Sequence, residues 1–277
     1  MSNRRQSLPR HQGGLSIVEL LVALVISLLL MTGVVQVFLS SKQTYASNES
    51  ASRLQENGRF ALEFIAQSAR HAGYVEAANS PAILPPTIAS PGNGICNDSG
   101  TCSSQGADEE SDNVAFVFQP RIQDGLRRDC LGVNGTGTYA INDTDMIINQ
   151  FVIIDADPGN GEPHPALGCR SRNTRGGWVT GAAAQRLIDG IDALQVQYGI
   201  STGGDSNSVN QYVSADRVTN WGNVLAIRIA VLANSMNPVN PPAPARQYVL
   251  LDAAPISFND GKSRQIFTTT IKLRNTY

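Results

Sequence analysis

An apolar run near the N-terminus constrains this chain more than any other feature. Residues 15–39 contain a single charged side chain, Glu19. The hydrocarbon core of a bilayer is about 30 Å thick, and a helix needs about 20 apolar residues to cross it. The apolar core of a cleavable secretory signal is shorter, at about 7–15 residues. The run therefore predicts a membrane-spanning helix over residues 15–40.

The residues before this run form a short basic leader. Residues 1–14 include Arg4, Arg5 and Arg10 and no acidic residue, whereas only Lys42 follows the run closely. Positive residues are retained on the cytoplasmic side of a membrane. We therefore expect a cytoplasmic N-terminus and an exported remainder.

Glu19 is unexpected in such a segment. A carboxylate inside a membrane helix costs about 2.5–3.5 kcal/mol on insertion scales. One interpretation places Glu19 at the interface, where the N-terminal end of the helix dipole favours a negative charge. The other interpretation is that the carboxylate pairs with a group of opposite charge.

The residues around Glu19 favour the second interpretation. Residues 13–20 read GGLSIVEL, which resembles the processing site of type IV prepilins. The resemblance implies that a prepilin peptidase cuts after Gly14 and methylates the new N-terminus at Leu15, so that Glu19 becomes the fifth mature residue. Many relatives have phenylalanine where this chain has Leu15. In assembly, Glu19 of one subunit would pair with the terminal amine of its neighbour, because such a pair is costly to leave unmade in apolar surroundings.

The helix is expected to continue beyond the membrane. No proline occurs between Leu15 and Ser80, and apolar residues recur every three or four positions between residues 54 and 69. Gly73 is typical of a helix end. We therefore expect a continuing helix over residues 41–74, followed by a head domain over residues 75–277.

The head is rich in strand patterns. Glycine and proline make up 39 of the 277 residues (25 + 14), which favours turns and short strands over a helical bundle. A short helix is expected over residues 214–218, with Ser214 as its cap. The fold class is α+β, with an antiparallel sheet packed against the long helix. The predicted strands are 114–118, 146–154, 194–198, 224–232, 248–251 and 266–273.

Several segments of the head resemble the PilW group of type IV minor pilins. The order of the segments, taken with the processing motif, is more specific than any one of them. The resemblance implies a type IV pilin-like fold and a structural, noncatalytic role in priming pilus assembly, with twitching motility and adhesion as the associated processes. The matching segments are 58–63, 72–74, 194–199, 221–224 and 271–275.

The resemblance also implies location and partners. The protein would cross the bacterial inner membrane once, with a periplasmic head, and then join the pilus at the cell surface. Its partners would be the prepilin peptidase, other minor pilins, the major pilin, the inner-membrane assembly platform and a large tip adhesin, with no cofactor. Nucleic acid is not expected as a partner, because the net charge is −2 and the isoelectric point about 5.9.

Two alternative functions stay open. A J-type minor pseudopilin of a type II secretion system has a similar long helix and strand-rich head. A membrane-tethered periplasmic hydrolase would use Ser201, since residues 199–203 match the G-x-S-x-G pattern. A nucleophile elbow needs a helix next, but a polar loop follows here. The mature chain offers only His71 and His164 as bases.

The four cysteines all lie in the exported part. An even count there indicates disulfides, with three possible connectivities. Local closure favours Cys96 with Cys102 and Cys130 with Cys169. Zinc is not favoured, because the spacing of Cys96 and Cys102 exceeds the usual two to four intervening residues.

One loop could hold calcium. Asp155, Asp157 and Asn160 supply three oxygen-bearing side chains within residues 155–161. The loop lacks the distal glutamate of an EF-hand, so a plain turn is the favoured interpretation.

Overall fold

The computed structural model describes most of the chain in segments. Residues 1–15, including Gly14 and Leu15, lie outside the described part. The chain divides between Asn48 and Glu49 into two units, and each is described by itself. The described residues are 16–76, 86–90, 96, 102–107, 110–123, 125–135, 141–142, 144–162, 164–173, 177–179, 181–203 and 208–273.

One long helix, α1, runs over Ile17–His71 and has 55 residues. At its start the Ser16 hydroxyl accepts a hydrogen bond from the Val18 N–H at 3.3 Å. At its end Gly73 takes a positive φ of 73°, a left-handed conformation that glycine adopts without steric cost. The predicted helix end at Gly73 is confirmed.

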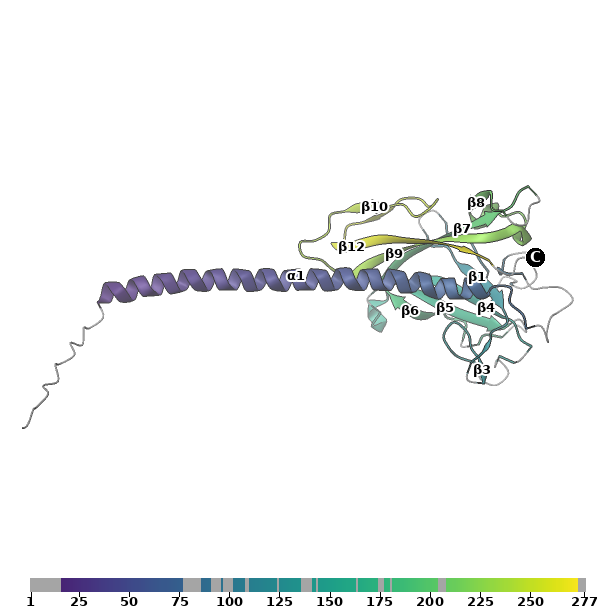
Figure 1. Ribbon diagram of the computed structural model, residues 1–277, viewed down its shortest axis with the longest axis horizontal. Coiled ribbons are helices and arrows are strands. Elements are labelled where there is room, and N and C mark those ends of the chain that lie inside the picture. Colours follow the sequence, from purple (N-terminus) through teal and green to yellow (C-terminus); the bar gives the residue numbers. More distant parts are fainter. Residues whose placement is uncertain are drawn as a thin grey trace, which may run out of the picture. The chain divides into compact units, whose positions relative to one another are not determined.

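All remaining regular structure lies in the unit formed by residues 49–277, as far as it is described (Figure 1). The strands are β1 (Val114–Phe118), β2 (Ile122–Gln123), β3 (Leu126–Arg127), β4 (Ile147–Ile154), β5 (Ala166–Asn173), β6 (Gln185–Asp189), β7 (Ile191–Ile200), β8 (Gln211–Val213), β9 (Val224–Pro238), β10 (Arg246–Tyr248), β11 (Ile256–Phe258) and β12 (Lys262–Lys272). Three single-turn 3₁₀ helices are η3 (Pro158–Asn160), η4 (Ala215–Arg217) and η5 (Trp221–Asn223).

The strands form two four-stranded sheets rather than the single sheet expected from the sequence. One has the order β1-β4-β5-β6 and the other β12-β9-β7-β8, and every pairing is antiparallel. Two hairpins, β2–β3 and β10–β11, complete the head. The α+β class and the antiparallel pairing are as predicted.

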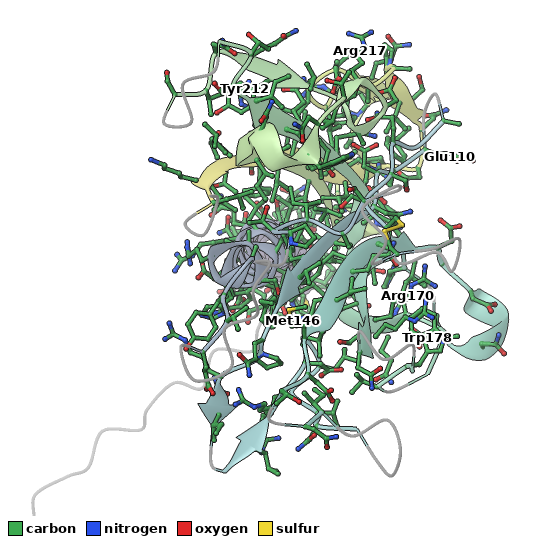
Figure 2. All side chains as sticks on the ribbon, turned by 90° about the vertical axis from the view of Figure 1, so that its right-hand side faces the viewer. Glu110, Met146, Arg170, Trp178, Tyr212 and Arg217 are labelled. Atoms are coloured by element: carbon green, nitrogen blue, oxygen red, sulfur yellow. A yellow bond between two sulfur atoms is a disulfide. The ribbon has the colours of Figure 1, made fainter. Side chains whose placement is uncertain are left out.

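The core of the head forms where both sheets meet the second half of α1. Leu54, Ala61 and Ile65 are buried on the helix, and they share one apolar cluster with Phe116 of β1 and Val196 of β7. Figure 2 shows the helix end-on, with a sheet on either side. The three-to-four spacing seen in the sequence therefore marks the face that both sheets cover.

Two local predictions were wrong. Residues 249–251 do not continue a strand, because β10 ends at Tyr248. Ser214 precedes the short helix η4, but its side chain makes no capping bond. Its hydroxyl instead donates to the Asp216 carboxylate, which removes it from the backbone N–H groups that a cap would serve.

Gly58 permits the close approach of α1 to β12. A Cβ atom at this position would lie 2.3 Å from the ring of Phe267. Gly58→Ala should therefore destabilise the head by about 1–2 kcal/mol, because the forced shift of the ring outweighs the better helix propensity of alanine. Gly33→Ala on the same helix is the matched control, since no atom lies within 4 Å of the added Cβ. Denaturant unfolding of the full chain in detergent measures both variants. Equal stability of the two would contradict the packing argument.

Candidate functional site

The first half of α1 presents apolar side chains over its whole circumference. Its most apolar stretch has a mean hydropathy of 2.6, and no residue of that stretch is buried. The hydroxyls within it bond to the helix backbone: Ser27 donates to the Ala23 carbonyl at 2.8 Å and Thr32 to the Leu28 carbonyl at 2.9 Å. In lipid, where no water is available, these polar groups are thereby satisfied internally. The segment is long and apolar enough to cross a membrane.

Glu19 lies in the first turn of this helix and is exposed. Within the residues that the structure describes, no cationic group pairs with it. A cationic partner of this carboxylate would have to lie beyond these described residues. The helix N-terminus itself favours a negative charge there.

The polar end of the apolar run is also marked by side-chain contacts. The Lys42 ammonium lies 5.0 Å from the centre of the Phe38 ring, a cation–π geometry. About two to three helical turns beyond Lys42, Arg53 pairs with Glu49 at 2.8 Å. Between about residue 40 and residue 53 α1 has the surface of a water-exposed helix.

Both cysteine pairs that sequence analysis favoured are present as disulfides. Cys96 joins Cys102 across six residues, and Cys130 joins Cys169 across 39 residues. Cys169 lies on β5, and Cys130 follows β3. The longer bridge therefore ties the segment after β3 to the middle of a sheet.

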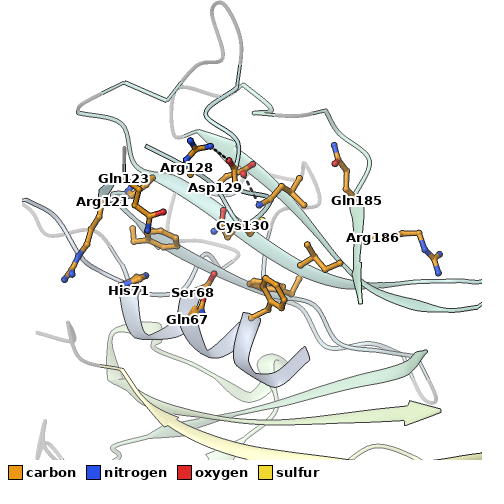
Figure 3. Close-up of a pocket in the computed structure, with 18 residues that line it drawn as sticks. Gln67, Ser68, His71, Arg121, Gln123, Arg128, Asp129, Cys130, Gln185 and Arg186 are labelled. Atoms are coloured by element: carbon orange, nitrogen blue, oxygen red, sulfur yellow. Dashed lines mark hydrogen bonds between the residues drawn. The ribbon is translucent and has the colours of Figure 1, made fainter. Parts of the chain in front are cut away.

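A cleft of about 710 Å³ lies beside this second disulfide (Figure 3). His71 and Gln67 of α1 line one side, and Arg128 and Asp129 line the other. Asp129 Oδ1 accepts the N–H groups of Leu131 and Val133 at 2.9 and 3.0 Å, so this carboxylate shapes the turn that carries Cys130.

Asp129 was not singled out from the sequence, although an aspartate three residues before Gly132 is a common turn signal. Its Oδ2 is buried and accepts no hydrogen bond from the described residues. Burial raises the pKa of Asp129, while the backbone N–H groups act in the opposite direction. The cleft holds a structural carboxylate, and the His71 ring beside it packs against Phe118 at 5.9 Å between centres.

The residues of the hydrolase alternative lie on separate elements. Ser201 follows β7 directly, and its N–H donates to the Asn223 carbonyl at 3.2 Å. The next described residues, 202–203 and 208–210, lead into β8, with no helix among them. His71 ends α1, and His164 precedes β5 in the other sheet. The strand–turn–helix context that a nucleophile elbow requires is not formed by these residues.

The loop considered for calcium is organised as a turn around η3. The Asn160 amide donates to the Asp157 carboxylate, and the Asp157 and Glu162 backbones bond to each other in both directions. Asp155 is exposed. Among the described residues, no three His, Cys, Asp or Glu side chains gather as a metal site would need.

Comparisons with known proteins agree with these features. Residues 150–275, a range that begins within β4 and includes β5 to β12, match the family model described as type IV pilus-assembly protein W. Residues 9–35 match the prokaryotic N-terminal methylation motif. No curated protein matches the chain. Among solved structures, a type IV-like pilin from Thermus thermophilus is 16% identical, with a TM-score of 0.45, over 81% of this chain and 98% of that one.

Proposed function

Because the chain is a minor pilin of the type IV pilus, of the PilW type, we propose that it joins other minor pilins in the membrane and primes assembly of the filament. Pilins of this kind are structural rather than enzymatic proteins. The observation that carries the proposal is the methylation motif over residues 9–35, which covers the start of α1, together with the most apolar stretch of that helix, of which no residue is buried. Such a helix needs either lipid or neighbouring helices around it.

The proposed maturation begins at the basic leader. Prepilin peptidase cleaves between Gly14 and Leu15 and methylates the Leu15 amine. The new N-terminus then lies four residues before Glu19, about one helical turn away. Side-by-side packing of such helices brings the amine of one subunit to the carboxylate of the next.

The proposed topology is a single pass through the bacterial inner membrane. The leader is cytoplasmic, in keeping with its arginines, and the head is periplasmic. Two disulfides in the head fit an oxidising compartment. The assembled subunit is then displayed with the pilus at the cell surface.

The proposed partners are the other minor pilins, the major pilin, the inner-membrane assembly platform and a large tip adhesin. Deletion of the gene should abolish or strongly reduce surface pili and twitching motility. Loss of protein secretion with normal pili would instead identify the chain as a pseudopilin.

Cleavage is tested by changing the residue before the cut. Gly14→Val should leave a membrane-bound precursor that is 14 residues longer than the mature form, because the peptidase no longer accepts the bulkier side chain. Gly13→Val is the matched control and should be processed. Electrophoretic mobility and N-terminal sequencing measure both. A mature N-terminus other than Leu15 in the unchanged protein would sink the assignment.

A further inference from the structure

The outer edge of β12 is unpaired. β12 is the terminal strand of the sheet β12-β9-β7-β8, and it bonds only to β9. Its pairing with β9 is regular from Arg264 to Lys272. Beyond that pairing, no hydrogen bond reaches the backbone of residues 265–271 from the described part of the chain. An edge of this length is a template for a further strand.

The register shows which backbone groups point outward. The Leu273 N–H donates to the Leu225 carbonyl at 2.9 Å, so residue 273 belongs to a hydrogen-bonded pair. In an antiparallel ladder bonded and non-bonded residues alternate. The even-numbered residues Ile266, Thr268 and Thr270 therefore direct both N–H and C=O away from β9, and all three side chains are exposed.

The middle of this edge carries none of the usual features that block strand addition. Residues 265–270 read QIFTTT and include neither charge nor proline. The nearest charge, Arg264, is turned inward, where it bonds to Asp192 at 2.7 Å and to Asp260 at 2.6 Å. Arg264 holds the pKa of Asp260 at about 2, so the ion pair of Arg264 with Asp260 persists throughout the physiological pH range. Native proteins protect or cover such an edge.

A groove of about 830 Å³ runs between this edge and α1. Gln265, Phe267 and Thr269 of β12 form one wall. On the other wall Phe60 of α1 is 44% exposed. The contact of Gly58 with the Phe267 ring sets the spacing of the two walls, so the groove is preformed. The two phenyl rings supply apolar surface, and charged side chains of α1 lie along the same groove: Glu56, Arg59, Glu63 and Arg70.

The occupant must itself be a polypeptide. Only an extended backbone offers N–H and C=O groups at the spacing of the outward groups of β12, with alternate side chains directed into the groove. A second copy of this chain does not fit, because two identical edges pair symmetrically in antiparallel fashion. Within the unit of residues 49–277, the part of α1 from Ser52 to Arg70 lies beside β12 (Figure 1). In such a pair the two copies of residue 49 would lie at opposite ends of the paired strands, whereas the segments that precede them are anchored in one membrane.

We propose that an extended strand from the head of a different pilin adds to the outer edge of β12, with its apolar side chains in the groove against Phe60 and Phe267. This inference rests on the proposed role in pilus assembly and specifies one of its contacts. Outward backbone bonds at Ile266, Thr268 and Thr270 supply the affinity, and the groove selects the side chains of the partner.

The first test blocks the edge in the full-length protein, expressed in place of the wild type. The double variant Thr268→Lys, Thr270→Lys puts charges on exposed edge positions without altering the bonds to β9. Gln247→Lys, on the exposed face of β10, is the matched control. We expect recovery of the double variant in sheared pili to fall at least about tenfold while the control is unchanged, and processing at Gly14 should be normal in both.

The second test identifies the neighbour. A photo-crosslinking residue at position 268 should yield an adduct, resolved by mass spectrometry, with a strand segment of another protein that carries a prepilin methylation motif. The same residue at position 247 should not. Normal recovery of the double variant, or adducts only with a second copy, would overturn the edge proposal while leaving the pilin role intact. Failure of the unchanged protein to enter pili would instead contradict the proposed function.

Discussion

Glu19→Ala is expected to insert in the membrane and to be cleaved, but to fail in docking to neighbouring pilins. Insertion should be normal because alanine removes the cost of a carboxylate in apolar surroundings. Docking should fail because Glu19 has no cationic partner among the described residues of its own chain, and its proposed partner is the terminal amine of a neighbour. Breaking an ion pair in apolar surroundings costs about 3–5 kcal/mol, which predicts a loss of at least tenfold in incorporation.

The measurement uses a strain that lacks the wild-type copy. Mobility reports processing, and sheared pili and crosslinks to other minor pilins report assembly. Glu49→Ala is the matched control on the same helix, because Glu49 lies beyond the apolar run and already pairs with Arg53. Normal incorporation and normal crosslinks of Glu19→Ala would show that the residue serves only at the membrane interface.

The long helix was predictable because its signals are local. The apolar run, the absence of proline and the stop at Gly73 are each visible within a few residues of sequence, and α1 ends at His71, three residues before the predicted end at residue 74. The strands with clean alternation or short apolar runs were also found. β7 contains the predicted segment 194–198, and β4 contains all but the first residue of 146–154.

The sequence did not predict that the strands form two sheets. In the sheet β1-β4-β5-β6, the strands β5 and β6 show no clear hydrophobic pattern. β5 reads ALGCRSRN and is buried by its place between β4 and β6, so its burial follows from pairing rather than from hydrophobic alternation. Gly168 in its interior weakens strand propensity. That glycine is needed because a Cβ there would lie 2.3 Å from Ile154 of β4. Such a requirement appears only when the two strands are paired.

The same distinction, between features visible in the local sequence and features that depend on strand pairing, applies to the candidate site. Glu19 and the apolar run are contiguous in sequence, and their chemistry can be read without a fold. The edge of β12 cannot be read from the sequence, because a strand is an edge only when no further strand pairs with one of its two sides. The residues 265–270 would be unremarkable in a central strand, and they become a docking surface only through the order β12-β9-β7-β8.

Removal of the disulfide between Cys130 and Cys169 should cost about 4 kcal/mol of head stability, and removal of the one between Cys96 and Cys102 about 2 kcal/mol. The difference follows from loop length, since the bridges span 39 and six residues, and a longer closed loop restricts the unfolded chain more. The bridge from Cys130 to Cys169 also secures the turn shaped by Asp129 against β5. At about 2–4 °C per kcal/mol for a head of this size, the expected falls in Tm are about 8–16 °C and 4–8 °C.

Each bridge should be removed as a double alanine variant, so that no free thiol is left to form a new pair. Peptide mapping without reduction verifies the remaining bridge, and thermal unfolding of the full chain in detergent gives the two Tm values. The bridge from Cys96 to Cys102 serves as the internal control, because its removal makes the same chemical change in a much shorter closed loop. Four free thiols in periplasmic protein would refute both bridges. A larger loss from the Cys96–Cys102 variant would show that native packing around each bridge, rather than restriction of the unfolded chain, sets the stability of the head.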